Sequence, residues 1–226
     1  MSKVKSTISK SQLRDFTRGE EIIHAATHGF GAVLGIVALI FLCIKTLESG
    51  SHLFPSIMFG VSIIMLYSAS AFFHTTCAIF RPECESRVRE VAKVCDHAMI
   101  NLLIVGTYAP ASINGIGGTL GYVIFGVVAT LCTAATVLIL VDIERFRKLN
   151  FVLYFLAGWA IAVAIYPFYK SVGIGGILLL VLGGIAYTVG AFFYKLDRIK
   201  YMHVLWHLFV ILGTVLHYLL VYFYCI

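Results

Sequence analysis

Long windows without a charged residue dominate this sequence. Six of them lie between its Asp, Glu, Lys and Arg residues, at 22–44, 49–80, 97–141, 149–169, 171–194 and 201–226. A helix of about 20 apolar residues crosses roughly 30 Å of hydrocarbon, so each window is long enough to span a bilayer. Because 60% of the 226 residues are hydrophobic and 12% are charged, the chain has more apolar surface than one soluble core can bury. The mean hydropathy is +0.95.

The window 97–141 is long enough for two helices, and Pro110 with Gly115, Gly117 and Gly118 divides it. Continuous apolar runs favour helices over the strands of a membrane barrel, in which apolar and polar residues alternate. We therefore predict an all-α fold, a seven-transmembrane helical bundle. The expected helices lie near 22–44, 54–78, 92–109, 119–141, 149–168, 173–194 and 202–224.

The basic residues predict how this bundle is oriented. Fifteen of the 17 Lys and Arg residues fall in the tail 1–21 and in the second, fourth and sixth loops, whereas Lys45 and Lys170 fall on the opposite side. The positive-inside rule then puts the N-terminus in the cytoplasm and the C-terminus outside. We expect a cytoplasmic tail at 1–21 and a single membrane domain at 22–226, in a multi-pass protein of the plasma membrane. Because the basic groups are spread over four segments, the net charge of +6 does not indicate a nucleic-acid partner.

Ionisable groups inside spans are costly and therefore direct the search for function. Ser70 and His74 are four residues apart near the cytoplasmic end of the second expected helix, and His203 and His207 have the same spacing at the start of the last. Residues four apart share one helical face. Asp96 opens the third expected helix on the same side of the membrane. We expect these five side chains at one depth.

Three imidazoles from two helices fit the ligand set of catalytic zinc, which has three protein ligands and one open position. His74, His203 and His207 are the candidate ligands. Asp96 is a candidate base for a water molecule on the metal, and Ser70 is a candidate hydroxyl beside it. The alternative is that the histidines only make hydrogen bonds between helices, because the HxxxH spacing also arises by chance. Spacing alone leaves both interpretations open.

A further polar stripe lies at the cytoplasmic start of the first expected helix. It consists of Glu21, His24 and His28, at spacings of three and four residues, at nearly the same depth as the candidate ligands. For the remaining histidines we predict structural roles; they are His52, His97 and His217.

The polar motifs follow one another in a recognisable order. They are Gly19-Glu20-Glu21-Ile22, Thr27-His28-Gly29, Ser70-xxx-His74, Asp96-His97, Gly106-Thr107-Tyr108-Ala109-Pro110 and His203-xx-Trp206-His207-Leu208-Phe209. Together they resemble the hemolysin III family, which belongs with the progestin and adipoQ receptors and is more distantly similar to alkaline ceramidases. The resemblance covers nearly all of the chain from about Gly19 onward and implies a fold of seven helices.

The resemblance implies a zinc ion bound by the family's histidine of the second helix, matched by His74, and its two histidines of the last, matched by His203 and His207. It also implies that Asp96 and Ser70 lie near the metal in the proposed hydrolysis of lipid amides such as ceramides. One departure is His24, where relatives more often carry asparagine. Candidates for supporting the ligands are Glu21 and His28.

Three functions are compatible with this sequence. The first is a zinc-dependent membrane hydrolase that cleaves an amide or ester of a membrane lipid, with a ceramide-like substrate. The second is a receptor or sensor of lipid state in which zinc only ties helices together. The third, from the family's name, is a pore-forming hemolysin, although a secreted cytolysin does not need so apolar a polytopic chain.

Overall fold

The computed structural model describes residues 16–79 and 87–226, and the regular structure in them is helical throughout. The all-α prediction is therefore confirmed. The expected tail up to residue 15 and part of the second expected loop, which includes the basic residue Arg81, lie outside the described residues. The elements in chain order are α1 (Arg18–Ser49), α2 (Leu53–Ile79), α3 (Arg87–Tyr108), the π-helix η1 (Ala109–Ile116), α4 (Gly118–Gly158), the 3₁₀-helix η2 (Ala160–Ala164), α5 (Ile165–Lys195) and α6 (Met202–Tyr224).

Five helical stretches of the described chain are long and apolar enough to cross a membrane. They are α1, α2, α3 together with η1, the 78-residue run from α4 through α5, and α6. Large apolar side chains cover their outward faces; Phe30, Val141 and Val163 are 62%, 68% and 92% exposed. Such a surface is stable where lipid rather than water covers it. The helices are those of an integral multi-pass membrane protein.

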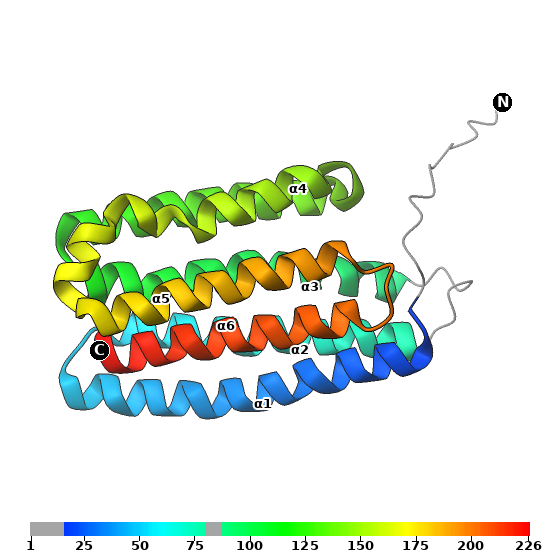
Figure 1. Ribbon diagram of the computed structural model, residues 1–226, viewed down its shortest axis with the longest axis horizontal. Coiled ribbons are helices and arrows are strands. Elements are labelled where there is room, and N and C mark those ends of the chain that lie inside the picture. Colours follow the sequence, from blue (N-terminus) through cyan, green and yellow to red (C-terminus); the bar gives the residue numbers. More distant parts are fainter. Residues whose placement is uncertain (1–15, 80–86) are drawn as a thin grey trace.

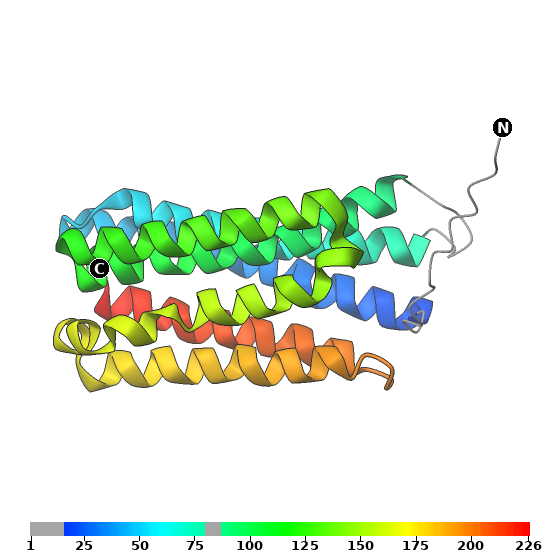
Figure 2. The same ribbon diagram turned by 90° about the horizontal axis from the view of Figure 1, so that it is seen from above.

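Two residues with non-helical backbone angles interrupt the 78-residue run, in addition to the 3₁₀-helix η2. Asp142 has extended backbone angles (φ −165°, ψ 99°) within α4, and Gly173 has a positive φ of 64° within α5. Figure 2 shows the ribbon of α4 reversing direction at one end of the bundle. The Asp142 carboxylate accepts a hydrogen bond from the Arg145 amide at 2.9 Å and so caps the segment that follows. The expected helix boundaries at 141 and 173 fall beside these interruptions.

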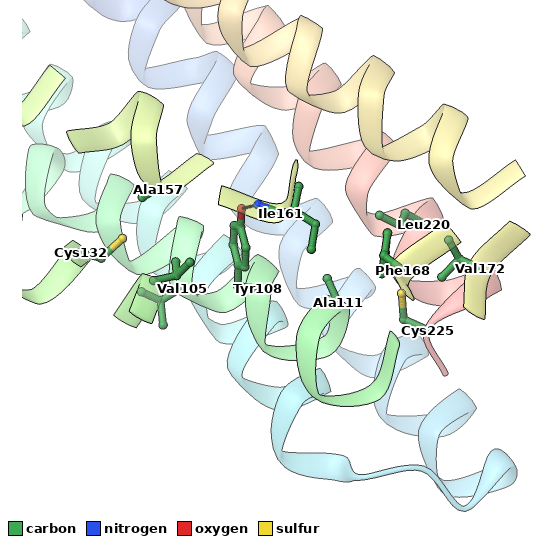
Figure 3. Close-up of a cluster of buried hydrophobic side chains, with 11 residues drawn as sticks. Val105, Tyr108, Ala111, Cys132, Ala157, Ile161, Phe168, Val172, Leu220 and Cys225 are labelled. Atoms are coloured by element: carbon green, nitrogen blue, oxygen red, sulfur yellow. Dashed lines mark hydrogen bonds between the residues drawn. The ribbon is translucent and has the colours of Figure 1, made fainter. Parts of the chain in front are cut away.

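The expected helix 149–168 is not one continuous α-helix. It comprises the end of α4, then η2, then the first turn of α5. The Tyr108 hydroxyl from α3 accepts a hydrogen bond from the Ile161 amide at 2.8 Å and donates one to the Gly158 carbonyl at 3.1 Å. Figure 3 shows Tyr108 pointing at Ile161 within a buried apolar cluster that includes Phe168 and Leu220. This side chain satisfies backbone groups that the α-helix would otherwise pair, so the interruption is stabilised by tertiary contact.

Helix α1 begins at Arg18, four residues before the expected position, because a capping box defines its start. The Thr17 hydroxyl accepts from the Glu20 amide at 3.3 Å, and the Glu20 carboxylate accepts from the Thr17 amide at 3.0 Å. The other oxygen of Glu20 accepts from the Tyr201 amide at 3.1 Å, immediately before α6. The beginnings of α1 and α6 are thereby joined.

The helix ends gather at two opposite ends of the bundle. Figure 1 shows the start of α1 and the connection between α5 and α6 at one end, and the C-terminus and the connection between α1 and α2 at the other. Five histidines lie toward the first of these ends, because they belong to the start of α1, the end of α2 and the start of α6; they are His24, His28, His74, His203 and His207.

Candidate metal centre

The three predicted ligand histidines come together in the folded chain. His74 lies near the C-terminal end of α2, and His203 and His207 lie one turn apart in the first turns of α6. All three are buried, and one ligand nitrogen from each lies within 4.8 Å of the other two. This spacing is suitable for a single cation between two helices.

Glu21 fixes the orientation of His74. Its Oε2 lies 2.6 Å from His74 Nδ1 in a buried contact between α1 and α2. A carboxylate only accepts hydrogen bonds, so His74 donates through Nδ1 and keeps the lone pair of Nε2 for another partner. His74 Nε2 has no hydrogen-bond partner among the described residues. A carboxylate behind the imidazole of a metal ligand is the usual supporting arrangement.

Thr27 orients His207 in the same way, through a contact that the sequence does not predict. Its hydroxyl lies 2.9 Å from the carbonyls of Ile23 and His24, which take its single proton, and 3.3 Å from His207 Nδ1. His207 Nδ1 then donates to the hydroxyl, and Nε2 keeps its lone pair. Thr27 belongs to the motif Thr27-His28-Gly29, but nothing in the sequence shows that its side chain contacts α6.

His24 lies inside the cluster, rather than behind it. Its side chain is 0% exposed, and its ring centre is 4.7 Å from that of His74, 4.8 Å from that of His203 and 5.1 Å from that of His207. Its Nδ1 is 3.5 Å from Glu21 Oε2. Glu21, His24 and His74 form a second group whose ligand atoms all lie within 4.8 Å of one another.

His28 supports the cluster by stacking. Its ring is parallel to that of His207 within 10°, with the ring centres 3.7 Å apart, and it makes an edge contact with Tyr67 at 5.0 Å. Both nitrogens of His28 lack a hydrogen-bond partner among the described residues. Because His28 belongs to α1 and His207 to α6, the stacking holds the His207 imidazole against α1.

The two predicted catalytic residues lie at different places relative to the histidines. Ser70 is buried in α2, one turn before His74. Asp96 in α3 has an 18% exposed side chain and lies 3.9 Å from His97 Nδ1. Among the described residues, no hydrogen bond or ion pair joins Asp96 to His74, His203 or His207. The catalytic roles of Ser70 and Asp96 stay predictions.

The remaining histidines are outside the cluster. His97 Nδ1 lies 2.9 Å from the Lys93 carbonyl, and His217 Nε2 lies 3.2 Å from the Leu180 carbonyl, so both contact backbone oxygens. His52 is exposed at the start of α2.

The donor set of the cluster fits a metal ion. Neutral imidazole nitrogens and a carboxylate are ligands for divalent transition metals. Buried nitrogens without a hydrogen-bond partner are uncommon, because each one has lost its hydrogen bonds to water. Such nitrogens occur in four histidines of this cluster, His24, His28, His74 and His203. A cation bound between these side chains would provide the partner that the described protein groups do not.

These observations define a class: an integral membrane protein of packed helices with a buried cluster of histidine and glutamate that can bind a metal at one end of the bundle. Comparison with known proteins gives the family. The sequence profile described as Haemolysin-III related matches residues 16–218, and the chain belongs to this family. The resemblance drawn from the motifs is confirmed.

Relatives share most of their length with this chain. It is 36% identical over 213 residues to "Hemolysin-3 homolog" of Bacillus subtilis (strain 168), covering 93% of this chain and 97% of that protein. It is 37% identical over 207 residues to "Hemolysin-3" of Bacillus cereus, covering 91% of each. A more distant similarity, 23% over 163 residues, joins it to human "Monocyte to macrophage differentiation factor", covering 71% of this chain and 66% of that protein.

Proposed function

We propose that this protein is a zinc-dependent hydrolase of membrane lipid amides or esters. The observation that carries the proposal is the grouping of three buried imidazoles, His74, His203 and His207, with ligand atoms within 4.8 Å of one another. Zinc with three protein ligands and an open position is the usual arrangement of a catalytic zinc site. A ceramide-like lipid is the substrate class that we infer from the family resemblance.

The proposal includes a bundle of seven spans with a cytoplasmic N-terminus and an external C-terminus. It is supported by the interruptions at Asp142 and Gly173, which divide the run from α4 through α5. It is also supported by the salt bridge between Lys93 at the start of α3 and Glu144 just after Asp142. That contact holds the α4 reversal at the end of the bundle where α3 begins. With the basic residues at this end, the positive-inside rule makes it the cytoplasmic end.

The protein groups have separate tasks in this reaction. His74, His203 and His207 would hold the zinc ion, with Glu21 and Thr27 keeping two of the imidazoles in the ligating tautomer. When bound, zinc polarises a carbonyl group and makes a water molecule more acidic. Ser70 would donate a hydrogen bond to the substrate. Asp96 would accept the proton of the attacking water, which requires its carboxylate to come within hydrogen-bond reach of that water.

The position of the site limits the route of the substrate. The cluster is buried between α1, α2 and α6, and the outward faces of these helices carry large apolar side chains such as Phe30 and Leu208. A lipid with its chains in the bilayer and its headgroup at the cytoplasmic surface can approach at this depth. We propose membrane lipids of the cytoplasmic leaflet as the binding partners.

A second candidate is a membrane-lipid sensor in which the metal only ties α2 to α6. It is favoured by the complete burial of His24 against the three candidate ligands, because a structural metal site is closed by protein on all sides. Pore formation is the third candidate, which the name of the Bacillus cereus relative suggests.

Purified wild-type protein in lipid nanodiscs, supplied with short-chain ceramide, should release fatty acid. Asp96→Asn should lower the turnover by roughly 10²–10⁴-fold, the usual contribution of a general base, with zinc content unchanged. Glu90→Gln, an exposed acid on the same helix, is the matched control and should keep full turnover. Zinc bound by a protein with no turnover on lipid amides or esters would favour the sensor. Dye leakage from liposomes would instead indicate a pore.

A further inference from the structure

Four imidazole rings, not three, surround one point at the cytoplasmic end of the bundle. The six distances between the ring centres of His24, His74, His203 and His207 fall in a narrow interval. They are 4.7, 4.8, 4.8, 4.9, 5.1 and 5.3 Å. Six nearly equal distances among four points describe a tetrahedron, so the four rings occupy its corners.

This spacing is the one expected for four imidazoles around a single zinc ion. A Zn–N distance of about 2.0–2.1 Å and tetrahedral angles put the centres of ligating rings roughly 5 Å apart. His24 stands as close to each of the three predicted ligands as they stand to one another. The ring arrangement therefore does not distinguish it from them.

His24 has no competing partner that explains its position. It is completely buried, and neither of its nitrogens has a hydrogen-bond partner among the described residues. Glu21 Oε2 lies 3.5 Å from Nδ1, which is too long for a hydrogen bond, and that oxygen already accepts from His74 at 2.6 Å. Phe16 packs edge-on against the His24 ring at 5.0 Å. The imidazole is thus enclosed but not paired.

In this structure, His24 shares its close group of ligand atoms with Glu21 and His74. Ligation of a cation at the centre of the tetrahedron therefore requires the His24 ring to turn, whereas His74, His203 and His207 already have ligand atoms within 4.8 Å of one another.

We propose that His24 is a displaceable fourth ligand of the metal. This inference rests on the proposed function, since it concerns the same cation. With a nitrogen toward the other three rings, His24 completes a closed shell of four imidazoles. With Nδ1 toward Glu21, it leaves one position open for water and substrate. His24 then decides whether the centre is closed, as in a structural site, or open, as in a hydrolytic one.

The test compares the metal environment in wild-type protein, His24→Phe and His24→Leu, all loaded with zinc or cobalt in detergent. Neither replacement side chain can ligate a metal. Two variants with side chains of different shape are used so that a folding defect in one of them does not decide the result. X-ray absorption of the zinc-loaded proteins counts the imidazoles around the metal. His97→Gln, a histidine outside the cluster, is the matched control.

We expect four imidazoles in the wild type and in His97→Gln, and three imidazoles with one oxygen ligand in the His24 variants. Azide binding to the cobalt proteins, followed by visible absorption, should be tighter in the His24 variants by roughly tenfold, because azide no longer competes with a protein ligand. Three imidazoles and equal azide affinity in all four proteins would overturn the role of His24 while leaving the proposed hydrolase intact. A wild-type protein that binds no zinc would overturn both proposals.

Discussion

The Glu21 carboxylate on α1 accepts a hydrogen bond from His74 Nδ1 on α2 at 2.6 Å, in a contact buried on both sides. It joins two helices at the depth of the histidine cluster. The acceptor character of the carboxylate determines which nitrogen of His74 is left to bind a cation. Glu21 would therefore act on a bound metal through His74.

Replacing Glu21 should weaken metal binding without removing a ligand. We expect Glu21→Gln to lower the affinity for zinc by about 10–100-fold, because the loss of such a supporting carboxylate lowers the basicity and restraint of the ligating imidazole. Competition with a chromophoric chelator in detergent measures the change. Glu48→Gln, an exposed acid at the other end of α1, should bind zinc like the wild type. Equal affinity in both variants would contradict the supporting role.

Removal of the metal should destabilise the bundle through its candidate ligands. A ligand present at 100 times its Kd stabilises a folded protein by about 2.7 kcal/mol, so EDTA should lower the Tm of the wild type by roughly 5 °C or more. The His203→Ala/His207→Ala double variant should bind less than a tenth of the wild-type zinc, and its Tm should not respond to EDTA.

The control for this measurement is His52→Ala, which changes an exposed histidine away from the cluster. It should retain both the zinc content and the EDTA response of the wild type. A double variant whose Tm still falls in EDTA by the wild-type amount would mean that the metal binds elsewhere.

The grouping of the histidines of α2 and α6 could be predicted from the sequence, because their positions are determined by spacing and by the ends of apolar runs. His203 and His207 carry a four-residue spacing at the start of an apolar run, and His74 lies at the end of another. Spacing determines a shared helical face, and the alternation of spans determines depth. These two rules bring the side chains to one level without any knowledge of packing.

The role of His24 could not be obtained in that way. Spacing shows that it shares a stripe with Glu21 and His28, but the direction of that stripe depends on how α1 rotates against α2 and α6. The rotation is set by tertiary contacts, among them the hydrogen bond from the Tyr201 amide to Glu20. The early start of α1 did have a local signal, since Thr17-Arg18-Gly19-Glu20 is a capping box.

The amino-acid sequence around η2 also contains no local feature that predicts its interruption of the α-helix. Its 3₁₀ geometry is stabilised by the Tyr108 hydroxyl from α3, about 50 residues earlier in the chain. Hydropathy shows that the segment is apolar, and it cannot show which backbone amide another helix will satisfy. The break at Asp142, by contrast, follows from a charged residue between two apolar runs.

Seven spans predict that the loops on either side of the fifth span face opposite compartments. A fluorescent protein fused after Lys148 should fluoresce, because the proposed topology puts that loop in the cytoplasm. Alkaline phosphatase fused after Lys170 or after Ile226 should be active, because it folds only outside. Phosphatase activity that is equal after Lys148 and after Lys170 would mean that the chain does not cross between them, and the bundle would have fewer spans.

Close packing of α4 against η1 predicts that alanine substitution at two glycines of α4 changes the free energy of unfolding by very different amounts. A Cβ atom on Gly121 would lie 2.2 Å from the Ser112 carbonyl oxygen, whereas a Cβ on Gly126 would meet nothing within 4 Å. The Ser112 oxygen belongs to the backbone of η1, so it cannot move aside as a flexible side chain does.

Gly121→Ala should therefore lower the free energy of unfolding by about 1–3 kcal/mol, the usual cost of overpacking. Gly126→Ala should leave it unchanged or raise it by up to about 1 kcal/mol, because alanine favours the helix. Denaturant titration in detergent micelles, followed by circular dichroism, gives both values. If the two variants were equally stable, α4 would not lie against η1 at this distance, and the first turn of α4 would have to sit farther from Ser112.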